Sequence, residues 1–386
     1  MKILYISNSS NWAGSCAALA NLLSVISKNH QVHVFLPCPK GDLCNKLDLM
    51  GINYTLSSKP YSDTVYPHRK NPFKYVYRLL LLFVQLISAR RDLKKLVVKF
   101  KPDIVHCNVG PLDISYSFCR KKNIPHVWHL REYQDLDFDM VFFPSKNKFM
   151  KKIHSEGNYN IAITNGVFNY WDLRPSIDRV IYDGVFSLKS TVIYNSNREK
   201  YFLFVGRVTE AKGPHHIINV LRQVIDVYPD YSLKIAGDIY PKSQYHSFLL
   251  SLIEENKLDK HVVFLGNRKD IYDLMSNATA LIVPSRFEGF GFITAEAMYN
   301  NCLVIGRNTG GTKEQFDNGL NDVGHEIALR FNDDNELKDC MMSAIRNDMS
   351  LLTKSARAVV MSRYSIEVSA ANVLAFYDQI YRKELD

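Results

Sequence analysis

Short apolar runs alternate with amphipathic stretches along this chain, and the pattern occurs in both halves. In the first half the strand-like and helix-like stretches are, in order, 2–7, 17–27, 31–36, 43–50, 72–99, 103–107, 126–130 and 140–144. A second series consists of 201–208, 214–227, 233–236, 245–255, 262–265, 271–275, 280–283, 294–299 and 303–305. Alternating strands and helices build parallel sheets that carry helices on both faces. The sequence therefore predicts two doubly wound, Rossmann-like α/β domains.

The chain length and one polar stretch divide the chain into domains. A chain of 386 residues is too long for one typical core. We place the first domain at residues 1–188 and the second at 189–364, because the polar stretch 187–200 precedes the second series. Residues 365–386 are predicted to form a terminal helix that returns to the first domain, with Ser365 as its N-cap. Since open α/β sheets bind ligands beyond the carboxyl ends of their strands, we expect the active site in a cleft between two facing domains.

Cysteine usage and the apolar runs favour a cytoplasmic chain without a membrane span. The seven cysteines include no C-x-x-C pair, and Cys38 and Cys44 have no partners at zinc spacing, so reduced thiols are expected. The first residues run directly into a strand rather than into a signal peptide. The most apolar run, 79–89, has about half the length of a membrane-spanning helix.

The net charge of +9 suits an anionic partner such as nucleic acid, nucleotide phosphates or anionic lipid. Part of this charge is interleaved with aromatic residues around the apolar run 79–87. The aromatic residues are Tyr61, Tyr66, Phe73, Tyr75 and Tyr77, and the basic residues are His68, Arg69, Lys70, Lys74, Arg78, Arg90, Arg91, Lys94, Lys95, Lys99 and Lys101. This composition predicts a peripheral contact with an anionic membrane at the inner face, and a core-packed helix with a solvated basic face is the alternative.

Two glutamates bracket a glycine-containing loop between a predicted strand and a predicted helix. Seven residues separate Glu288 from Glu296, and Gly289 and Gly291 lie between them. The glycines allow the backbone to approach a ligand, and the helix that begins near Ile293 points free N–H groups at an anion. Carboxylates accept hydrogen bonds from sugar hydroxyls. The loop therefore suits a ligand that carries vicinal hydroxyls and phosphates.

A second loop, residues 205–213, also follows a strand and precedes a helix. It contains Gly206, Arg207 and Lys212. Arginine can bind phosphate with two parallel hydrogen bonds, and lysine acts as a mobile point charge. Two cations at a glycine-lined strand end fit a diphosphate leaving group, and solvated surface charge is the alternative.

These two loops resemble the signature segments, including E-x7-E, of retaining glycosyltransferase family 4, which has the GT-B architecture. The resemblance covers nearly the whole chain and is strongest between residues 180 and 320. It implies that Arg207 and Lys212 grip the donor phosphates, that Glu288 contacts the transferred sugar and that Glu296 holds the ribose. The donor-binding residues it implies are Gly14, Ser15, Gly206, Arg207, Lys212, Asn267, Arg268, Glu288, Gly289, Phe290, Gly291 and Glu296, and the catalytic residues are His129, Arg207, Lys212 and Glu288.

Shorter segments add to the resemblance. Residues 266–268, which include Asn267 and Arg268, resemble a turn that contacts the base, and residues 309–314 resemble a structural G-G-x-x-E turn. Residues 181–185 resemble an I-x-N-G-V motif, with Asp183 in place of asparagine.

The first half resembles the family less closely. Only Gly14, next to Ser15, remains in a loop where the family has two glycines, and the loop lacks the G-x-G-x-x-G of a dinucleotide dehydrogenase. His129 lies where family members place a histidine near the donor sugar. Arg131 and Glu132 are assigned to the acceptor side, and a simple pairing of Glu132 with Arg131 is the alternative.

The leading interpretation is a glycosyltransferase that moves a sugar from a nucleotide diphosphate sugar to an acceptor hydroxyl with retention, without a metal ion or cofactor. The acceptor implied by the resemblance is a glycan or lipid-linked glycan in bacterial capsule or O-antigen synthesis. A sugar-nucleotide epimerase or a phosphorylase of the same architecture is the alternative among enzymes. A basic nucleic-acid-binding protein is the alternative of another class. We expect no nucleic-acid partner, because the charge accompanies no recognised binding module and the glycine–glutamate loop would stay unexplained.

Overall fold

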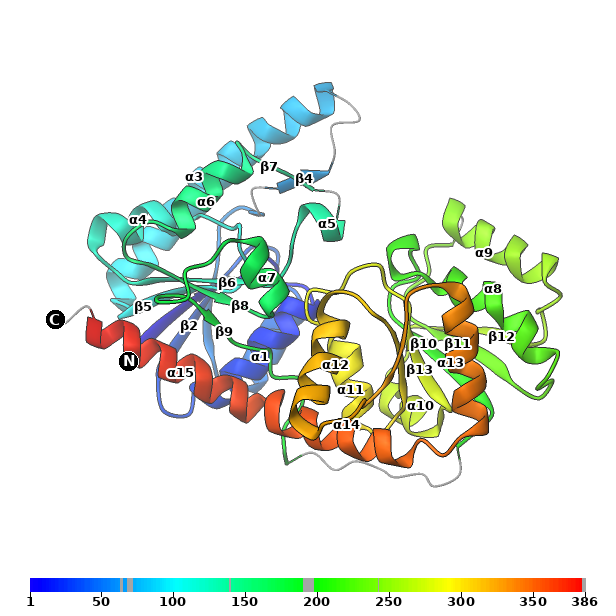
Figure 1. The fold of residues 1–386 in the computed structure, drawn as a ribbon. Helices are drawn as coiled ribbons and strands as arrows, with labels where there is room; N and C mark the ends of the chain where they lie inside the picture. Colours follow the sequence, from blue (N-terminus) through cyan, green and yellow to red (C-terminus); the bar gives the residue numbers. More distant parts are fainter. Residues whose placement is uncertain (63–64, 68–71, 139, 190–197, 242, 384–386) are drawn as a thin grey trace. The chain divides into compact units, whose positions relative to one another are not determined.

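The computed structural model describes residues 1–386 except 63–64, 68–71, 139, 190–197, 242 and 384–386. The chain divides into two compact units (Figure 1). The N-terminal unit comprises Met1–Gly184 and Ile366–Asp386, and the C-terminal unit comprises Val185–Ser365. The polar stretch 187–200, on which the predicted domain boundary rests, lies partly outside the described residues.

A parallel sheet of seven strands forms the centre of the N-terminal unit. In spatial order the strands are β3 (Asn53–Leu56), β2 (Gln31–Leu36), β1 (Lys2–Ile6), β5 (Ile104–Cys107), β6 (His126–Leu130), β8 (Asn158–Ala162) and β9 (Arg179–Val180). β1 pairs with β2 on one side and with β5 on the other, so the strand order reverses beside β1. Such a reversal is the switch point at which doubly wound folds bind their ligands.

Helices cover both faces of this sheet (Figure 1). One face carries α1 (Gly14–Ile26), α2 (Asp42–Leu49) and α15 (Ile366–Lys383). The other carries α3 (Pro72–Phe100), α4 (Tyr116–Lys122) and α6 (Lys146–Ile153), while α5 (Asp135–Phe138) and α7 (Asn165–Tyr170) lie in connections. The terminal helix α15 contributes Val373, Phe376 and Ile380 to the core beneath α1. Burial of this apolar stripe holds the end of the chain on the N-terminal unit.

The predicted strand 140–144 does not join the parallel sheet. Instead β7 (Met140–Phe142) pairs antiparallel with β4 (Val65–Pro67) in a separate ribbon. β8 takes the place beside β6, although Asn158 and Asn160 interrupt its apolar pattern. Both amides are buried and bonded: Asn160 Nδ2 donates to Asp178 at 2.8 Å, and Asn158 Nδ2 donates to Ser155 at 3.0 Å. Tertiary hydrogen bonds therefore allow a strand that the apolar pattern does not predict.

The C-terminal unit has a six-stranded parallel sheet. In spatial order the strands are β12 (Val262–Gly266), β11 (Ser232–Ala236), β10 (Tyr201–Val205), β13 (Ala280–Val283), β14 (Val304–Arg307) and β15 (Leu329–Phe331). The order in chain terms is 3-2-1-4-5-6, which is the order of dinucleotide-binding Rossmann sheets. Its switch point lies between β10 and β13.

Two groups of helices cover this second sheet (Figure 1). α8 (Pro214–Ile225), α9 (Gln244–Glu255) and α13 (Asp334–Arg346) share a hydrophobic core with the strands. α11 (Phe292–Tyr299), α12 (Gly310–Val323) and α14 (Ser350–Arg363) pack together on the opposite face, and η1 (Glu210–Lys212) and α10 (Ile271–Asn277) complete the unit. The prediction of two Rossmann-like α/β domains is confirmed.

Candidate active site

The two predicted donor loops leave the sheet of the C-terminal unit at its switch point. Gly206 and Arg207 directly follow β10, and the loop 284–291 directly follows β13. These two strands are hydrogen-bonded neighbours, and parallel strands end at the same edge of the sheet. The topology therefore brings the predicted phosphate-binding and sugar-binding residues to one edge.

Backbone contacts hold the two loops side by side. The N–H of Arg286 donates to the carbonyl oxygen of Ala211 at 3.0 Å. Gly213 has φ of 71°, and a Cβ atom there would lie 2.8 Å from the carbonyl oxygen of Pro284. A larger residue would force the loops apart.

This arrangement places two predicted catalytic side chains in contact. Lys212 Nζ lies 2.5 Å from Glu288 Oε1, and the exposed fractions of the two side chains are 26% and 16%. Arg207, in the same loop as Lys212, is exposed and forms no ion pair within the part of the chain that the structure describes. The site therefore combines one free cation with one cation that a carboxylate orients.

Residues in the first turns of α12 form hydrogen bonds to the backbone of the Glu288 loop. Residues 309–314, which the sequence predicts as a turn, open this helix. The N–H of Gly311 donates to the carbonyl oxygen of Glu288 at 2.7 Å. Gln315 Nε2 donates to the carbonyl oxygen of Phe290 at 2.7 Å and to that of Gly291 at 3.0 Å. A Cβ atom at Gly311 would collide with the backbone of Phe290, so the glycine pair of this motif permits the close approach.

Helix α11 begins at the end of the same loop. Gly291 precedes the helix with φ of 89°, and no described side chain caps it. The first-turn N–H groups of such a helix attract anions. The side chain of Phe290 is only 3% exposed and packs against Phe292 and Tyr364. Its predicted donor contact is therefore restricted to the backbone.

Glu296 lies within α11 in a poorly solvated position. Burial raises the pKa of its carboxyl group to about 7, and a hydrogen bond from Tyr272 at 3.3 Å partly opposes this effect. Its carboxylate can accept hydrogen bonds from vicinal hydroxyls, as the sequence suggests. The neighbour Tyr272 was missed, since only the packing of α10 against α11 brings it there.

The ends of β11 and β12 complete the edge. Asn267 and Arg268 follow β12 and are exposed, and both guanidinium nitrogens Nε and Nη2 of Arg268 bind Asp270. Gly237, which the sequence interpretation missed, follows β11 with φ of 144° and packs directly on the backbone of Gly206. Glycines thus follow both β10 and β11, which lets the two strand ends pack closely together.

The predicted site residues of the N-terminal unit form a second cluster. Arg131 is buried and donates to Asp183, and its Nε donates to the carbonyl oxygen of Asn108 at 3.0 Å. The amide of Asn108 donates in turn to the carbonyl oxygen of Ser15 at 3.0 Å. Asp183, which stands where the family has asparagine, therefore supplies the negative charge that the buried Arg131 requires.

These contacts show how Arg131 and Glu132, the residues assigned to the acceptor side, are held in the unit. The guanidinium of Arg131 is occupied inside the unit by Asp183 and Asn108, and its assignment to the acceptor side stays a prediction. Glu132 is half-buried and accepts a hydrogen bond from Gln134 Nε2 at 2.8 Å. Gly14 opens α1, and the space that a Cβ atom would take there is empty. His129 is buried beside Arg131.

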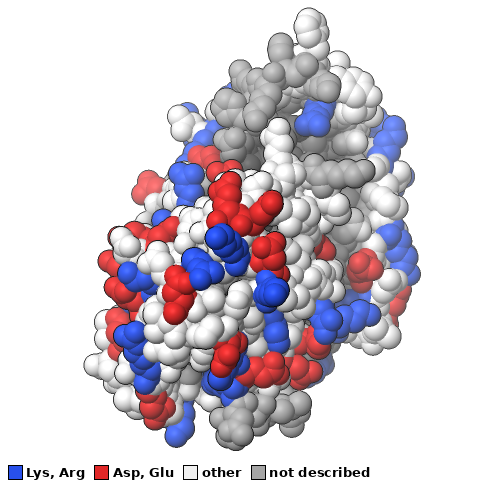
Figure 2. All heavy atoms as spheres, turned by 90° about the vertical axis from the view of Figure 1, so that its right-hand side faces the viewer, with Lys and Arg blue, Asp and Glu red and all other residues white. Residues whose placement is uncertain are grey.

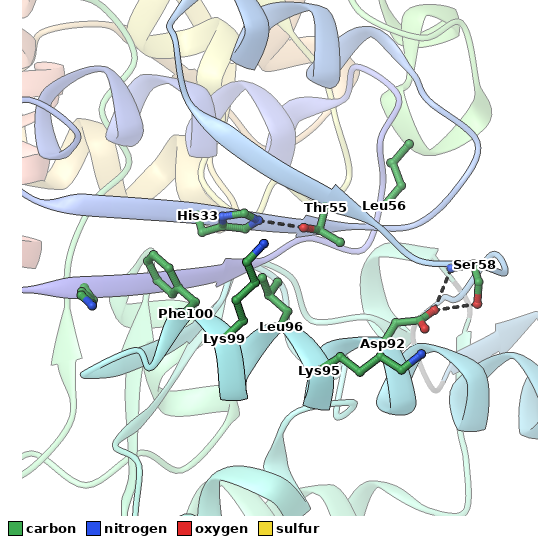
Figure 3. A pocket seen from close by; sticks show the side chains of 10 residues that line it. His33, Thr55, Leu56, Ser58, Asp92, Lys95, Leu96, Lys99 and Phe100 are labelled. Carbon is green, nitrogen blue, oxygen red and sulfur yellow. Dashed lines mark hydrogen bonds between the residues drawn. The ribbon is translucent and has the colours of Figure 1, made fainter.

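A cavity of about 560 Å³ lies elsewhere in the N-terminal unit (Figure 3). It lies between α3 and the edge of the sheet, where Lys99 and Phe100 face His33 of β2. Asp92 closes one end by accepting hydrogen bonds from the backbone and hydroxyl of Ser58. No predicted site residue lines this cavity.

The surface charge of the C-terminal unit is mixed. The face that carries α8, α9 and α13 shows lysines and arginines interspersed with aspartates and glutamates (Figure 2). A nucleic-acid interface requires a continuous basic face, which this surface does not offer.

Two absences concern metal ions and membrane spans. Among the described residues, no group of three or more His, Cys, Asp or Glu side chains is arranged to hold a metal ion. In the same part of the chain, no helix combines the length and the hydropathy that crossing a bilayer requires. Metal independence of the reaction stays a prediction.

The fold defines a class, the proteins built from two Rossmann-like α/β units. Within that class the chain resembles the crystal structure of Anabaena HepE in complex with UDP, with a TM-score of 0.78 and 17% identity. The likeness covers 98% of this chain and 100% of HepE. It shows that the chain has the fold of GT-B glycosyltransferases.

Sequence comparison then shows which proteins the chain is similar to. Residues 190–365 match the family described as glycosyl transferases group 1. An uncharacterized glycosyltransferase of Methanocaldococcus jannaschii is 28% identical over 76% of this chain and 80% of that protein. The capsular polysaccharide biosynthesis glycosyltransferase CapH of Staphylococcus aureus is 22% identical over 80% of this chain and 81% of that protein. The chain is a glycosyltransferase, and its residues 190–365 are similar to the group 1 family.

Proposed function

We propose that the chain transfers a sugar from a nucleoside diphosphate sugar to a hydroxyl of a growing surface glycan, with retention of anomeric configuration. The observation that carries this proposal is the Lys212–Glu288 ion pair at the switch point, beside the exposed Arg207 and the N-terminus of α11. UDP in the HepE structure and the capsular role in the name of CapH support the donor class and the pathway class.

The two cations act on the leaving group. As the bond from sugar C1 to the phosphate oxygen breaks, negative charge develops on the nucleoside diphosphate. Arg207 can bind that phosphate with two hydrogen bonds. The ammonium of Lys212 has three donors, so it can serve Glu288 and a phosphate oxygen together. We propose that these charges take the place of a metal ion, since preorganised donors stabilise developing charge without reorganisation.

Glu288 and the acceptor interact with the transferred sugar. Glu288 accepts hydrogen bonds from hydroxyls of the transferred sugar. The acceptor oxygen bonds to C1 on the face that the phosphate leaves, and its proton passes to the departing phosphate oxygen. An NMR assignment of the product's anomeric proton, after reaction with a UDP-sugar and a glycan acceptor, tests this route. An inverted product would overturn it.

The carboxyl group of Glu296 should make nucleotide binding depend on pH. Its pKa of about 7 means that the carboxylate is protonated as the pH falls through neutrality. The ionised form is the stronger acceptor for ribose hydroxyls, so affinity should fall by up to about tenfold between pH 8 and pH 6. Isothermal titration with a UDP-sugar measures this, because its diesterified diphosphate does not titrate in that range.

Glu296→Gln is the matched control. This variant should bind weakly at both pH values and lose the dependence, so an unchanged pH profile would contradict the assignment. The effect on stability has the opposite sign. Because the folded-state pKa lies above the usual 4.5, the contribution of Glu296 to stability falls as the pH rises from 4.5 to about 7.

Helix α3 carries the proposed membrane contact. Exposed apolar side chains at helical spacing cover its N-terminal half, namely Phe73, Val76, Tyr77, Leu80, Phe83, Val84 and Ile87, of which Phe73 is 87% exposed. The same face continues with the exposed cations Arg91, Lys94 and Lys95, whereas Arg90 is bound to Asp113. His68, Arg69 and Lys70 lie outside the described residues. An apolar face followed by cations matches the surface of an anionic bilayer.

The protein should therefore co-sediment with anionic vesicles at low salt. Replacing Leu80 and Val84 with glutamate should abolish this, and replacing Arg91 and Lys94 with glutamate should weaken it by at least tenfold, at about 1 kcal/mol per cation. Lys121 and Lys122 of α4 provide a charge-matched control pair on the same unit. Equal loss in the control, or no binding of the native protein, would refute a specific contact through α3.

A further inference from the structure

A chain of buried hydrogen bonds in the N-terminal unit ends at His129. It begins at Tyr5 in β1, whose hydroxyl lies 3.1 Å from that of Tyr377 in α15. The Tyr377 hydroxyl lies 2.6 Å from Nδ1 of His106 in β5. Nε2 of His106 lies 3.1 Å from Nδ1 of His129 in β6. All four side chains are buried, so their partners are fixed by packing.

His106 and His129, the two histidines in this series of hydrogen bonds, are both neutral at pH 7. Burial lowers the pKa of His106 and of His129 well below the usual value, and the nearby Arg131 lowers both further. A neutral imidazole carries one proton, on either Nδ1 or Nε2. The question is therefore which nitrogen of each ring holds it.

Arg131 settles the direction of the chain. Its Nη2 lies 3.2 Å from Nδ1 of His129, and a guanidinium can only donate. Nδ1 of His129 therefore carries a lone pair, and Nε2 of His106 must donate to it. Nδ1 of His106 then accepts from the hydroxyl of Tyr377, whose oxygen accepts from Tyr5.

The single N–H proton of the neutral His129 ring therefore lies on Nε2. Among the described residues Nε2 has no hydrogen-bond partner, and Oδ1 of Asp183 is 3.9 Å away. We propose that Tyr377 and His106 are positioning residues that hold His129 as a neutral donor, so that its Nε2–H binds an oxygen of the sugar substrate. This inference rests on the proposed function. It also gives the return of α15 to the N-terminal unit a role beyond covering the core.

The tautomer of His129 matters because the form protonated on Nδ1 could not donate a hydrogen bond from Nε2 to the substrate. With its proton on Nδ1, His129 would clash with Arg131 and present a lone pair to the substrate. A donor that is already oriented by a second layer of hydrogen bonds needs no rearrangement during the reaction. Tyr377→Phe removes the donor to Nδ1 of His106 and keeps the ring. His106 can then carry its proton on Nδ1 and stop donating to His129, while the fold is preserved.

Nitrogen-15 NMR of histidine-labelled protein tests the tautomer without any substrate. Long-range proton–nitrogen spectra, assigned with single His→Gln variants, should show His129 protonated at Nε2 only and neutral at pH 7. Tyr377→Phe should add an Nδ1-protonated tautomer to the signals of His106 and shift the Nδ1 signal of His129, which keeps Arg131 as a donor. A charged or Nδ1-protonated His129 in the native protein, or unchanged spectra in Tyr377→Phe, would overturn the proposal and leave the glycosyltransferase assignment standing.

Turnover provides the second readout. Tyr377→Phe should lower kcat roughly five- to tenfold, the worth of about one buried hydrogen bond, with little change in the donor KM. His106→Gln should retain most activity, because its amide N–H can replace the Nε2–H, whereas His106→Leu should not. His126→Gln is the matched control: His126 is buried on the opposite face of β6, bonded to Ser115 and Asn158. A native kcat in Tyr377→Phe, or an equal loss in His126→Gln at matched stability, would contradict a positioning role.

Discussion

Replacing Lys212 or Arg207 with alanine should lower the turnover of a nucleotide sugar by a factor of about 100 to 1,000. Each change removes a cation aimed at the charge that develops on the leaving phosphate, and loss of one preorganised donor has effects of this size. Arg207 lies in a loop and Lys212 is the last residue of η1. Both are at the sheet edge and outside the hydrophobic core, so the melting temperature should change little. The measurement is steady-state release of nucleoside diphosphate in the presence of an acceptor.

A matched control separates this effect from loss of surface charge. Arg222 lies on α8 in the same unit, where it forms an exposed ion pair with Asp226. Arg222→Ala should keep native turnover. Native turnover in both Arg207→Ala and Lys212→Ala would remove these residues from the site.

Glu288→Gln should lower turnover by about 10- to 100-fold, the next largest effect. The substitution keeps the shape of the side chain but removes a charged acceptor for sugar hydroxyls, whose hydrogen bonds contribute about 1.5–3 kcal/mol. Because Glu288 is assigned to the sugar, the affinity for free nucleoside diphosphate should stay within about threefold of native. Isothermal titration with the nucleotide and kinetics with the nucleotide sugar separate these two quantities.

The ion pair adds a further check on this assignment. Lys212 and Glu288 are in contact at 2.5 Å, so the double variant should lose less turnover than the product of the single losses. An equal fall in free-nucleotide affinity and in turnover would show that Glu288 binds the nucleotide rather than the sugar.

The fold was predictable wherever a strand of the sheet is a continuous apolar run in the sequence. Strands such as β10 and β13 are continuous apolar runs, because both faces of a parallel sheet are covered. β8 escaped prediction because Asn160 is polar. Its amide donates to Asp178 and to the carbonyl oxygen of Ile153, residues that the apolar pattern does not connect with it. The run 140–144 is apolar, yet it pairs in a separate ribbon whose partner strand β4 is too short to show a pattern.

The candidate site shows the same division between local and tertiary signals. The Glu288 loop was predictable, since its glycines and the following helix lie in one segment. Its supports were not: Gln315 and Tyr272 reach the site only through the packing of α12 and α10. The partner of Arg131 proved to be Asp183, which comes near only when β6 and the end of the unit meet.

Nucleotide binding by the C-terminal unit is the central claim, and isothermal titration tests it most directly. The full chain should be titrated with UDP, GDP, ADP and dTDP, beginning with UDP because the HepE structure holds it. We predict that one of the four binds at a single site, and that the Arg207→Ala/Lys212→Ala variant binds it at least 100-fold more weakly with an unchanged melting temperature. Binding of none of them by the native chain, or equal binding by both proteins, would contradict the site described at the switch point.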